Sequence, residues 1–129
     1  MSKQFVVQLK NEPGSLAALA ERLAARGVDL RAIGGGGIGD SGHVIMTTAD
    51  DDAALEVLQA DGYTFIEGDS ILAEVDDRPG GMARLARELA DAGVNIYGHL
   101  FLGRWGDRAM FTFVVDQPEL ARPILERKS

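Results

Sequence analysis

Hydrophobic residues either alternate with polar ones or run together as β-branched and aromatic residues in two short segments, residues 5–9 and residues 71–75. This pattern predicts a β-strand in each segment. Directly after each strand the spacing of apolar positions becomes helical, as it is for Leu16, Leu19 and Leu23. The chain therefore predicts an amphipathic helix with one apolar stripe behind each of the two strands.

The two strand–helix segments are copies of one another. Residues 11–34 align with residues 77–100 without gaps, at an offset of 66, and nine of the 24 aligned positions are identical. An offset of about half the chain indicates a duplicated module.

The predicted helix boundaries repeat as well. A Pro-Gly pair is expected to open each helix, with proline at the first helical position, where its missing N–H costs no hydrogen bond. A glycine in the left-handed conformation is expected to end each helix, and a strand is expected to follow at once. The residues concerned are Pro13, Gly14, Gly27 and Val28 in the first copy and Pro79, Gly80, Gly93 and Val94 in the second.

The remainder of each copy predicts a hairpin, a second helix and a closing strand. The hairpin turns are expected near residues 39–42 and 104–107, and the second helices from near Asp50 and Pro118. The first copy closes with a strand at residues 63–66, whereas the second has no sequence for a fourth strand before Ser129.

The element order predicts an α+β fold made of two tandem ferredoxin-like β-α-β-β-α-β modules with antiparallel sheets. The expected modules are residues 1–67 and residues 68–129, and the second module lacks its last strand. The strand at residues 71–75 should then keep an unpaired edge, which predicts a homodimer or an enzyme partner that covers it.

Composition narrows the classes of function. Hydrophobic residues make up 46% of the 129 residues, enough for a sizeable core. The formal net charge of −7 disfavours nucleic acid and anionic membranes as partners. The absence of cysteine excludes disulfides and thiol catalysis, and it fits the cytoplasmic location that we expect for a chain without a signal-like apolar segment.

The duplicated motif resembles the ACT domain. In the first copy, a strand is followed by Asn11-Glu12-Pro13-Gly14-Ser15-Leu16 and by a helix that ends at Gly27-Val28-Asp29-Leu30. The second copy matches from Asp77-Arg78-Pro79-Gly80-Gly81-Met82 to Gly93-Val94-Asn95-Ile96. The resemblance covers nearly the whole chain. It implies a regulatory protein of amino-acid metabolism, in which paired modules hold an amino-acid effector between them.

The resemblance also implies a set of ligand-binding residues. They are Asn11, Pro13, Gly14, Ser15, Leu16, Asp29 and Leu30 in the first copy and Asp77, Pro79, Gly80, Gly81, Met82, Asn95 and Ile96 in the second. The histidine that serine-sensing members carry in the loop is replaced by Leu9 and Val75, so the resemblance does not single out serine as the effector.

Physical chemistry gives these residues a role in binding a free amino acid. N–H groups at the start of a helix suit a carboxylate, and Asn11 or Asp77 would orient the ligand. Asp29 or Asp77 would pair with its ammonium group. Because Gly81 replaces Ser15, we expect the second site to be the more open of the two. The alternative interpretation is that the polar residues before Pro-Gly only cap helices and form turns.

Three other features need an interpretation. The acidic triplet at residues 50–52 suggests helix capping more than a metal site. The glycine-rich run at residues 34–39 lacks the Lys-Ser/Thr of a phosphate loop, so we expect a flexible or bulged loop there. Trp105 is expected on a hairpin tip, where it either anchors a partner or packs on a neighbouring side chain.

The sequence therefore predicts a regulatory protein that binds a small molecule, an amino acid before others, and that needs no metal or other cofactor. The alternative function is a ligand-free interaction module that docks on a metabolic enzyme or regulator. Catalysis is disfavoured, because two separated histidines, His43 and His99, offer no plausible triad with serine and aspartate.

Overall fold

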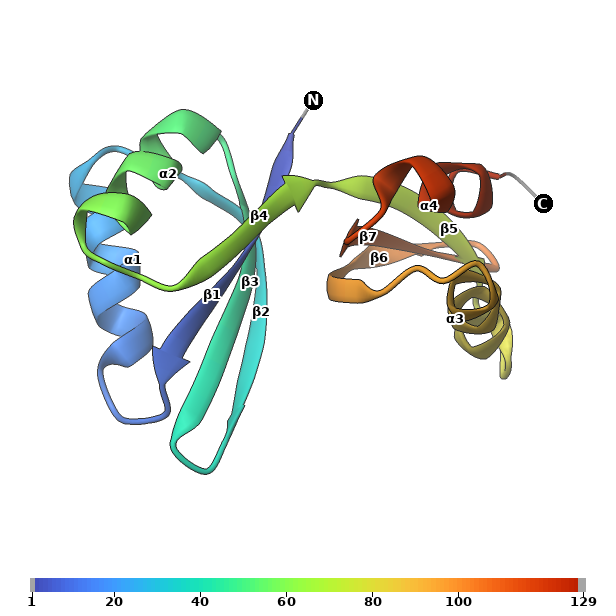
Figure 1. The fold of residues 1–129 in the computed structure, drawn as a ribbon, viewed down its shortest axis with the longest axis horizontal. Coiled ribbons are helices and arrows are strands. Elements are labelled where there is room, and N and C mark those ends of the chain that lie inside the picture. The colour runs from blue at the N-terminus through green and yellow to red at the C-terminus, as the bar shows by residue number, and fades with distance from the viewer. Residues whose placement is uncertain (1, 128–129) are drawn as a thin grey trace. The chain divides into compact units, whose positions relative to one another are not determined.

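The computed structural model describes residues 2–127 of the chain and divides the chain into two compact units. Unit 1 is Met1–Glu67 and unit 2 is Gly68–Ser129. Each unit places two helices against an antiparallel sheet (Figure 1). Among residues 2–127, no helix combines the length and the hydropathy that crossing a bilayer requires.

Unit 1 has the complete predicted order of elements. They are β1 (Lys3–Lys10), α1 (Ser15–Ala25), β2 (Leu30–Ile38), β3 (Ser41–Thr48), α2 (Asp51–Ala60) and β4 (Phe65–Asp69), which runs on into the first residues of unit 2. The sheet order is β2-β3-β1-β4, so β1 is paired on both sides. Alternate residues of β1, such as Phe5 and Val7, join Leu19 and Leu23 of α1 in the core.

Up to residue 127, unit 2 has the same order without its last strand. Its elements are β5 (Ile71–Asp76), α3 (Gly81–Asp91), β6 (Ile96–Trp105), β7 (Arg108–Val115) and α4 (Pro118–Leu125). The sheet order is β5-β7-β6, which leaves β5 at an edge. The four- and three-stranded sheets confirm the predicted fold class, including the missing strand. Phe113 of β7 packs at the centre of this core with Leu89 and Leu125.

Glycines end the helices as the sequence predicts. Gly27 has a φ of 72° and its N–H donates to the carbonyl of Ala24, while the N–H of Val28 donates to Leu23. Gly93 repeats this arrangement with a φ of 78°. These paired bonds form a Schellman motif, which satisfies carbonyls that the helix leaves without partners.

The first turn of each helix differs from the prediction. Pro13 does not occupy the first helical position, because Gly14 takes up a left-handed conformation with a φ of 92° and α1 begins only at Ser15. Gly80, with a φ of 89°, delays α3 to Gly81 in the same way. The Pro-Gly pair therefore forms the turn that leads into the helix.

Several strand boundaries were also predicted wrongly. The strands after the first helix of each unit begin at Leu30 and Ile96, because Val28 and Val94 are used in the Schellman motifs. The closing strand of unit 1 begins at Phe65, since the N–H of Tyr63 completes the end of α2 by donating to Leu58.

The glycine-rich run is neither a loop nor a bulge. Residues 34–37 lie inside β2 in continuous register with β3, and the irregularity in this pair falls earlier, between Leu30 and Ala32. The turn is confined to Gly39 and Asp40. Glycine keeps an extended conformation here because β3 holds it through ladder hydrogen bonds on one side.

The acidic triplet caps a helix, as predicted. The side chain of Asp50 accepts a hydrogen bond of 3.1 Å from the N–H of Ala53. Asp51 accepts from the hydroxyl of Thr48 and from the backbone N–H of Lys3, which ties α2 to β3 and β1. Capping by a carboxylate satisfies N–H groups of the first helical turn.

Candidate functional site

The loop end of unit 1 is organised around Asn11. Its side-chain amide donates to the carbonyl of Gly39 at 2.9 Å, and its backbone N–H donates to Asp40 at 3.0 Å. Both acceptors belong to the turn between β2 and β3. Asn11 therefore fastens the loop that precedes α1 to the tip of the hairpin.

Two glycines of β2 make room for this arrangement. A Cβ atom on Gly37 would lie 2.6 Å from the side-chain carbonyl carbon of Asn11, and a Cβ atom on Gly35 would lie 2.4 Å from the backbone oxygen of His43. Both distances are shorter than a carbon atom tolerates. Gly36 points to the opposite face and meets nothing within 4 Å.

A cavity of about 440 Å³ opens beside these glycines. Its volume falls in the range of roughly 300–1,000 Å³ that is typical of small-molecule sites. Polar residues come from the loop, from the start of α1, and from the strands through Lys10 and His43, and the strands also contribute glycine backbone and apolar side chains. The lining includes Lys10, Asn11, Glu12, Ser15, Leu16, Ile33, Gly35, Gly37 and Val44.

The corresponding recess in unit 2 is smaller, about 340 Å³, and its lining includes Asp77, Pro79, Met82, Arg104 and Phe111. A smaller volume does not measure openness, so the expectation that the second site is the more open one stays a prediction. The volume is smaller because side chains on β6 replace the glycines of β2. Phe101 pairs with Phe111 across the strands, with ring centroids 5.5 Å apart.

Arg104 of β6 is one of the residues that line the unit 2 recess. Its guanidinium lies 4.8 Å from the centroid of the Phe101 ring, and its Nε donates to the carboxylate of Asp77 at 2.7 Å. Asp77 occupies the position of Asn11 in the repeat, and its backbone N–H donates to Asp107 as that of Asn11 does to Asp40. The carboxylate predicted to hold a ligand ammonium thus already holds a cation of the chain.

Gly81 lets the start of α3 pack closely against the end of β5. A Cβ atom at this first residue of α3 would lie 2.1 Å from the carbonyl oxygen of Asp76. Close packing of the helix against the end of β5 therefore requires glycine. The extra space that Gly81 was expected to give a ligand is taken up by this contact.

The predicted site residues fall into two groups in each unit. Asn11, Ser15 and Leu16 line the 440 Å³ cavity. Pro13 and Gly14 line a broad, shallow surface that also includes Arg22 and Tyr63. In unit 2, Asp77, Pro79 and Met82 line the recess, and Gly80 precedes α3.

The second group lies past the other end of the helices. Asp29 accepts a backbone hydrogen bond from Ala49, and Leu30 begins β2. Asn95 exchanges hydrogen bonds with Asp116, and Ile96 packs against the unit 2 core. An 11-residue helix is about 16 Å long, so the structure does not bring the two groups together within one unit.

Sequence analysis missed the residues that shape the two recesses. Gly35 and Gly37 were assigned to a loop and Arg104 to the hairpin turn, whereas Glu12 and Phe101 received no role in the site. Alternation would have found the glycines, because residues 35 and 37 share a face when the run is extended. The position of Arg104 depends on an irregularity of β6 between Phe101 and Gly103, which the repeat does not contain.

Solved structures resemble this chain over nearly all of its length. Protein BT0572 from Bacteroides thetaiotaomicron is 22% identical with a TM-score of 0.71, and the match covers 97% of this chain and 86% of that chain. The regulatory subunit of aspartate kinase from Thermus thermophilus is 21% identical with a TM-score of 0.61, covering 97% and 87%. The corresponding subunit from Thermus flavus is 20% identical with a TM-score of 0.64, covering 97% and 90%.

The fold is ACT-like. The likeness to regulatory subunits of aspartate kinase establishes the fold that the duplicated motif predicts, and at these identities it establishes the fold alone. No protein-family model and no curated protein matches the chain.

Proposed function

We propose that this chain is a regulatory protein that binds a free amino acid at the loop end of unit 1. The observation that carries the proposal is the 440 Å³ cavity between Asn11, the first turn of α1 and the glycines of β2. The regulatory subunits of aspartate kinase that share this fold support a regulatory role.

The chemistry of the cavity suits both charged groups of an amino acid. Ser15 and Leu16 contribute the start of α1, where N–H groups lack partners within the helix and the helix dipole favours a carboxylate. Glu12 lies on the same wall and offers a carboxylate to an ammonium group. Leu9, Ile33 and Val44 give an apolar surface for a side chain.

The second group of predicted residues takes part only if modules pair. Asp29 and Leu30 lie at the far end of α1, so they reach the same ligand only from a second module placed against the first. We propose that effector sites form at such ACT–ACT interfaces, with the loop end of unit 1 as the primary half. In the recess of unit 2, Asp77 is already paired with Arg104, so we expect one ligand for each chain.

A calorimetric titration tests the proposal. The purified chain is screened against the twenty amino acids by thermal shift, and each hit is titrated to obtain its dissociation constant and stoichiometry. We expect one hit with a stoichiometry of one per chain. Ligand at 100 times its dissociation constant should stabilise the chain by about 2.7 kcal/mol.

Matched variants locate the site. Gly37→Ala displaces the Asn11 side chain and should weaken binding at least tenfold. Gly36 also lines the cavity, but a Cβ there meets no atom within 4 Å, so Gly36→Ala should weaken binding much less. Equal effects of the two substitutions, or binding of no amino acid, would rule out this site.

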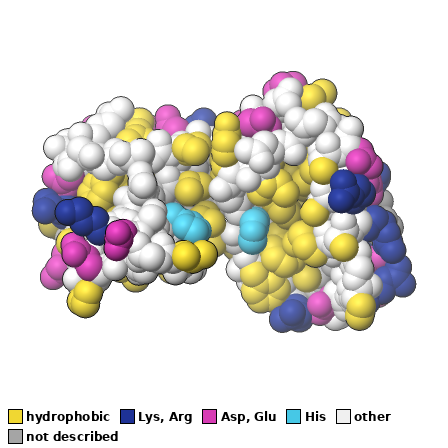
Figure 2. Space-filling view, turned by 60° about the horizontal axis from the view of Figure 1, so that its bottom comes forward, with side chains coloured by type: hydrophobic (Ala, Val, Ile, Leu, Met, Phe, Trp, Pro, Cys, Tyr) yellow, Lys and Arg dark blue, Asp and Glu magenta, His cyan; other side chains and the backbone are white. Residues whose placement is uncertain are grey.

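A specific observation favours a second candidate, a ligand-free module that docks on an enzyme. Figure 2 shows hydrophobic side chains gathered on one face of unit 2. The lining of a 370 Å³ groove in unit 2 includes Leu72, Leu102, Trp105 and Met110, and three of these side chains are exposed. The ring of Trp105 lies over Gly103, whose Cβ would come within 3.1 Å of it. Exposed apolar surface of this kind marks protein contacts.

A further inference from the structure

We infer that the ligand of unit 1 is an amino acid with a large, uncharged apolar side chain, of the size of leucine, methionine or phenylalanine. This side chain lies on the helix side of β2, between Leu16 and Ile33. The inference rests on the amino-acid binding proposed above, and it specifies the class of ligand that the cavity selects.

The cavity lies on the side of β2 that faces the helices. Ile33 and Gly35 of β2 pair with Met46 and Val44 of β3, which belong to the core of unit 1. Cross-strand partners lie on the same face of a sheet, so Ile33 and Gly35 face the side of the core. Ile33 is nevertheless 48% exposed. The inner face of β2 thus carries an apolar side chain that the rest of the unit leaves partly uncovered.

Leu16 of α1 gives the cavity a second exposed apolar wall. Its side chain is 50% exposed, and it lines the same cavity as Ile33. Leu9 and Val44, which pack with the core, also line this cavity. Removing exposed apolar surface from water is favourable. The exposed surfaces of Leu16 and Ile33 therefore favour a ligand that has an apolar group of its own.

The other end of the cavity is polar. Asn11, Glu12 and Ser15 line it where the loop before α1 is fastened to the hairpin tip. Within residues 2–127, no ion pair and no side-chain hydrogen bond involves Glu12. Because an unpaired carboxylate attracts an ammonium group, Glu12 marks the end of the cavity at which the amino group of the ligand binds.

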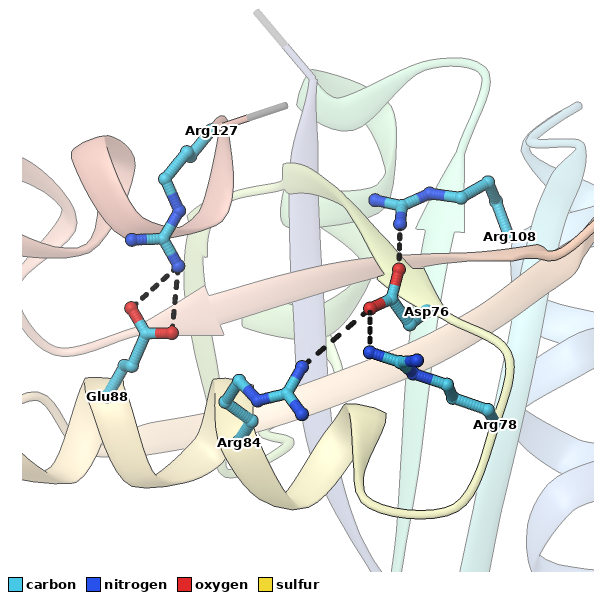
Figure 3. Close-up of polar contacts among 6 residues, drawn as sticks. All are labelled: Asp76, Arg78, Arg84, Glu88, Arg108 and Arg127. Atoms are coloured by element: carbon cyan, nitrogen blue, oxygen red, sulfur yellow. Dashed lines mark hydrogen bonds and ion pairs between the residues drawn. The ribbon is translucent and has the colours of Figure 1, made fainter. Parts of the chain in front are cut away.

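Unit 2 has a cation at the position of this carboxylate. Arg78 corresponds to Glu12 in the repeat, and it faces Asp76 at 3.3 Å (Figure 3). Asp76 also accepts a close hydrogen bond from Arg108 and faces Arg84 at 3.7 Å. The charges before α3 are thus matched within the chain, whereas Glu12 before α1 is left to a ligand.

The distance between the two ends of the cavity requires a long side chain. Gly37 lies beside Asn11 at the polar end, and Ile33 lies four residues away on the same strand, roughly 13 Å along an extended backbone. A ligand whose amino group lies near Glu12 reaches Ile33 only with a large side chain. Alanine and serine are too short to contact both ends.

The apolar end offers no counter-charge to a ligand. The ionisable residues that line the cavity are Lys10, Glu12 and His43. Lys10 directly follows Leu9 on β1, and His43 directly precedes Val44 on β3, so strand alternation directs both side chains to the outer face of the sheet. A charged ligand side chain at the apolar end would lose hydration without gaining an ion pair, which is unfavourable.

A series of unbranched amino acids tests the inference. Alanine, 2-aminobutyrate, norvaline and norleucine differ by one methylene at each step, and each is titrated calorimetrically into the full chain. The dissociation constant should fall about fourfold for each methylene, the factor expected when such a group is buried. Equal dissociation constants across the series would overturn the inference.

Lysine is the charged counterpart of norleucine, because its side chain has the same four carbons and ends in an ammonium group. Norleucine should bind about tenfold more tightly, since lysine would bring a charge to an apolar wall. Equal or tighter binding of lysine would overturn the apolar preference and leave amino-acid binding at unit 1 intact. Binding of no amino acid at all would overturn the proposed function and this inference together.

Two matched variants of β2 locate the side chain of the ligand. Ile33→Glu places a carboxylate at the apolar end and should reverse the preference, so that lysine binds more tightly than norleucine. Ile38 is 90% exposed and lies outside the cavity lining, so Ile38→Glu should keep the native ratio of the two dissociation constants. General destabilisation changes both constants by the same factor and leaves their ratio unchanged. A native ratio in Ile33→Glu would overturn the inference.

Light scattering separates a ligand from a second copy of the chain as the group that covers Ile33. The native chain and Ile33→Glu should have the same oligomeric state. A dimer that Ile33→Glu dissociates, with the ratio of dissociation constants unchanged, would assign the exposed apolar residues to pairing of chains. That result would overturn the inference and leave amino-acid binding at the polar end in place.

Discussion

The hairpins of the two units carry different residues at the equivalent position. In unit 1, Gly37 of β2 lies opposite Gly42, whereas in unit 2, Arg104 of β6 lies opposite Ala109. Around these positions the backbones agree: a Gly-Asp turn closes each hairpin, and its aspartate accepts a hydrogen bond from residue 11 in unit 1 and residue 77 in unit 2. The side chains differ. Gly37 lets Asn11 lie across the strand beside an open cavity, whereas Arg104 reaches Asp77 and covers Phe101.

This comparison separates two kinds of residue within a duplicated module. Glycines that take a left-handed conformation, such as Gly27 and Gly93, are the same in both units because the backbone requires them. Residues that line the recesses differ, since side chains there can change without altering the backbone. The shared scaffold therefore supports two different surfaces, one bordered by the glycines of β2 and the other lined by an arginine that pairs with Asp77.

The largest expected effect concerns the first residue of the helices α1 and α3. Gly81→Ala should lower the free energy of unfolding of unit 2 by about 3 kcal/mol, because the new Cβ meets the carbonyl oxygen of Asp76 and the backbone must move. Ser15 occupies the same position in unit 1 and already carries a Cβ, so Ser15→Ala should change stability by less than about 1 kcal/mol. Urea denaturation followed by circular dichroism measures both. Equal losses would show that the two helices do not differ in their packing against the preceding strand.

A smaller effect is expected on the glycine strand. Gly37→Ala should cost about 1 kcal/mol, since it displaces Asn11 from its hydrogen bond with Gly39. Gly36→Ala meets no atom within 4 Å and should be neutral or slightly stabilising, because alanine restricts the unfolded chain more than glycine does. Thermal unfolding of the two variants gives the comparison. A larger loss for Gly36→Ala would mean that Gly37 does not face Asn11.

The smallest effect concerns the ion pair between Arg104 and Asp77 in unit 2. A double-mutant cycle with Arg104→Ala and Asp77→Asn should give a coupling of about 0.5 kcal/mol, as expected for a largely exposed ion pair. Added salt should reduce this coupling through screening. Chemical denaturation monitored by Trp105 fluorescence measures the cycle. A coupling of zero at low salt would show that Arg104 does not hold Asp77 in solution.

Local sequence patterns were sufficient where one residue type satisfies a local requirement. The duplication, the helical stripes, the glycines that end the helices and the cap at Asp50 could all be predicted, because each follows from backbone hydrogen bonding or periodicity within a few residues. The three-stranded sheet of unit 2 was also predicted, because the second copy has no sequence for a fourth strand. The glycine run was misread because glycine has no strand preference of its own, and only the pairing with β3 makes it extended.

By itself, the sequence determined the duplicated α+β architecture and the loop residues at which a ligand site is proposed. The tertiary structure alone decided which side chains line each recess. An irregularity in β6 shifts its register by one residue, so that Arg104 takes the position opposite Ala109 that the ungapped repeat would give to Gly103. Register in a sheet depends on pairing between distant strands, and a shift of one residue changes which side chain faces a recess. For that reason two segments with nearly the same motif form one cavity bordered by glycines and one smaller recess lined by an arginine.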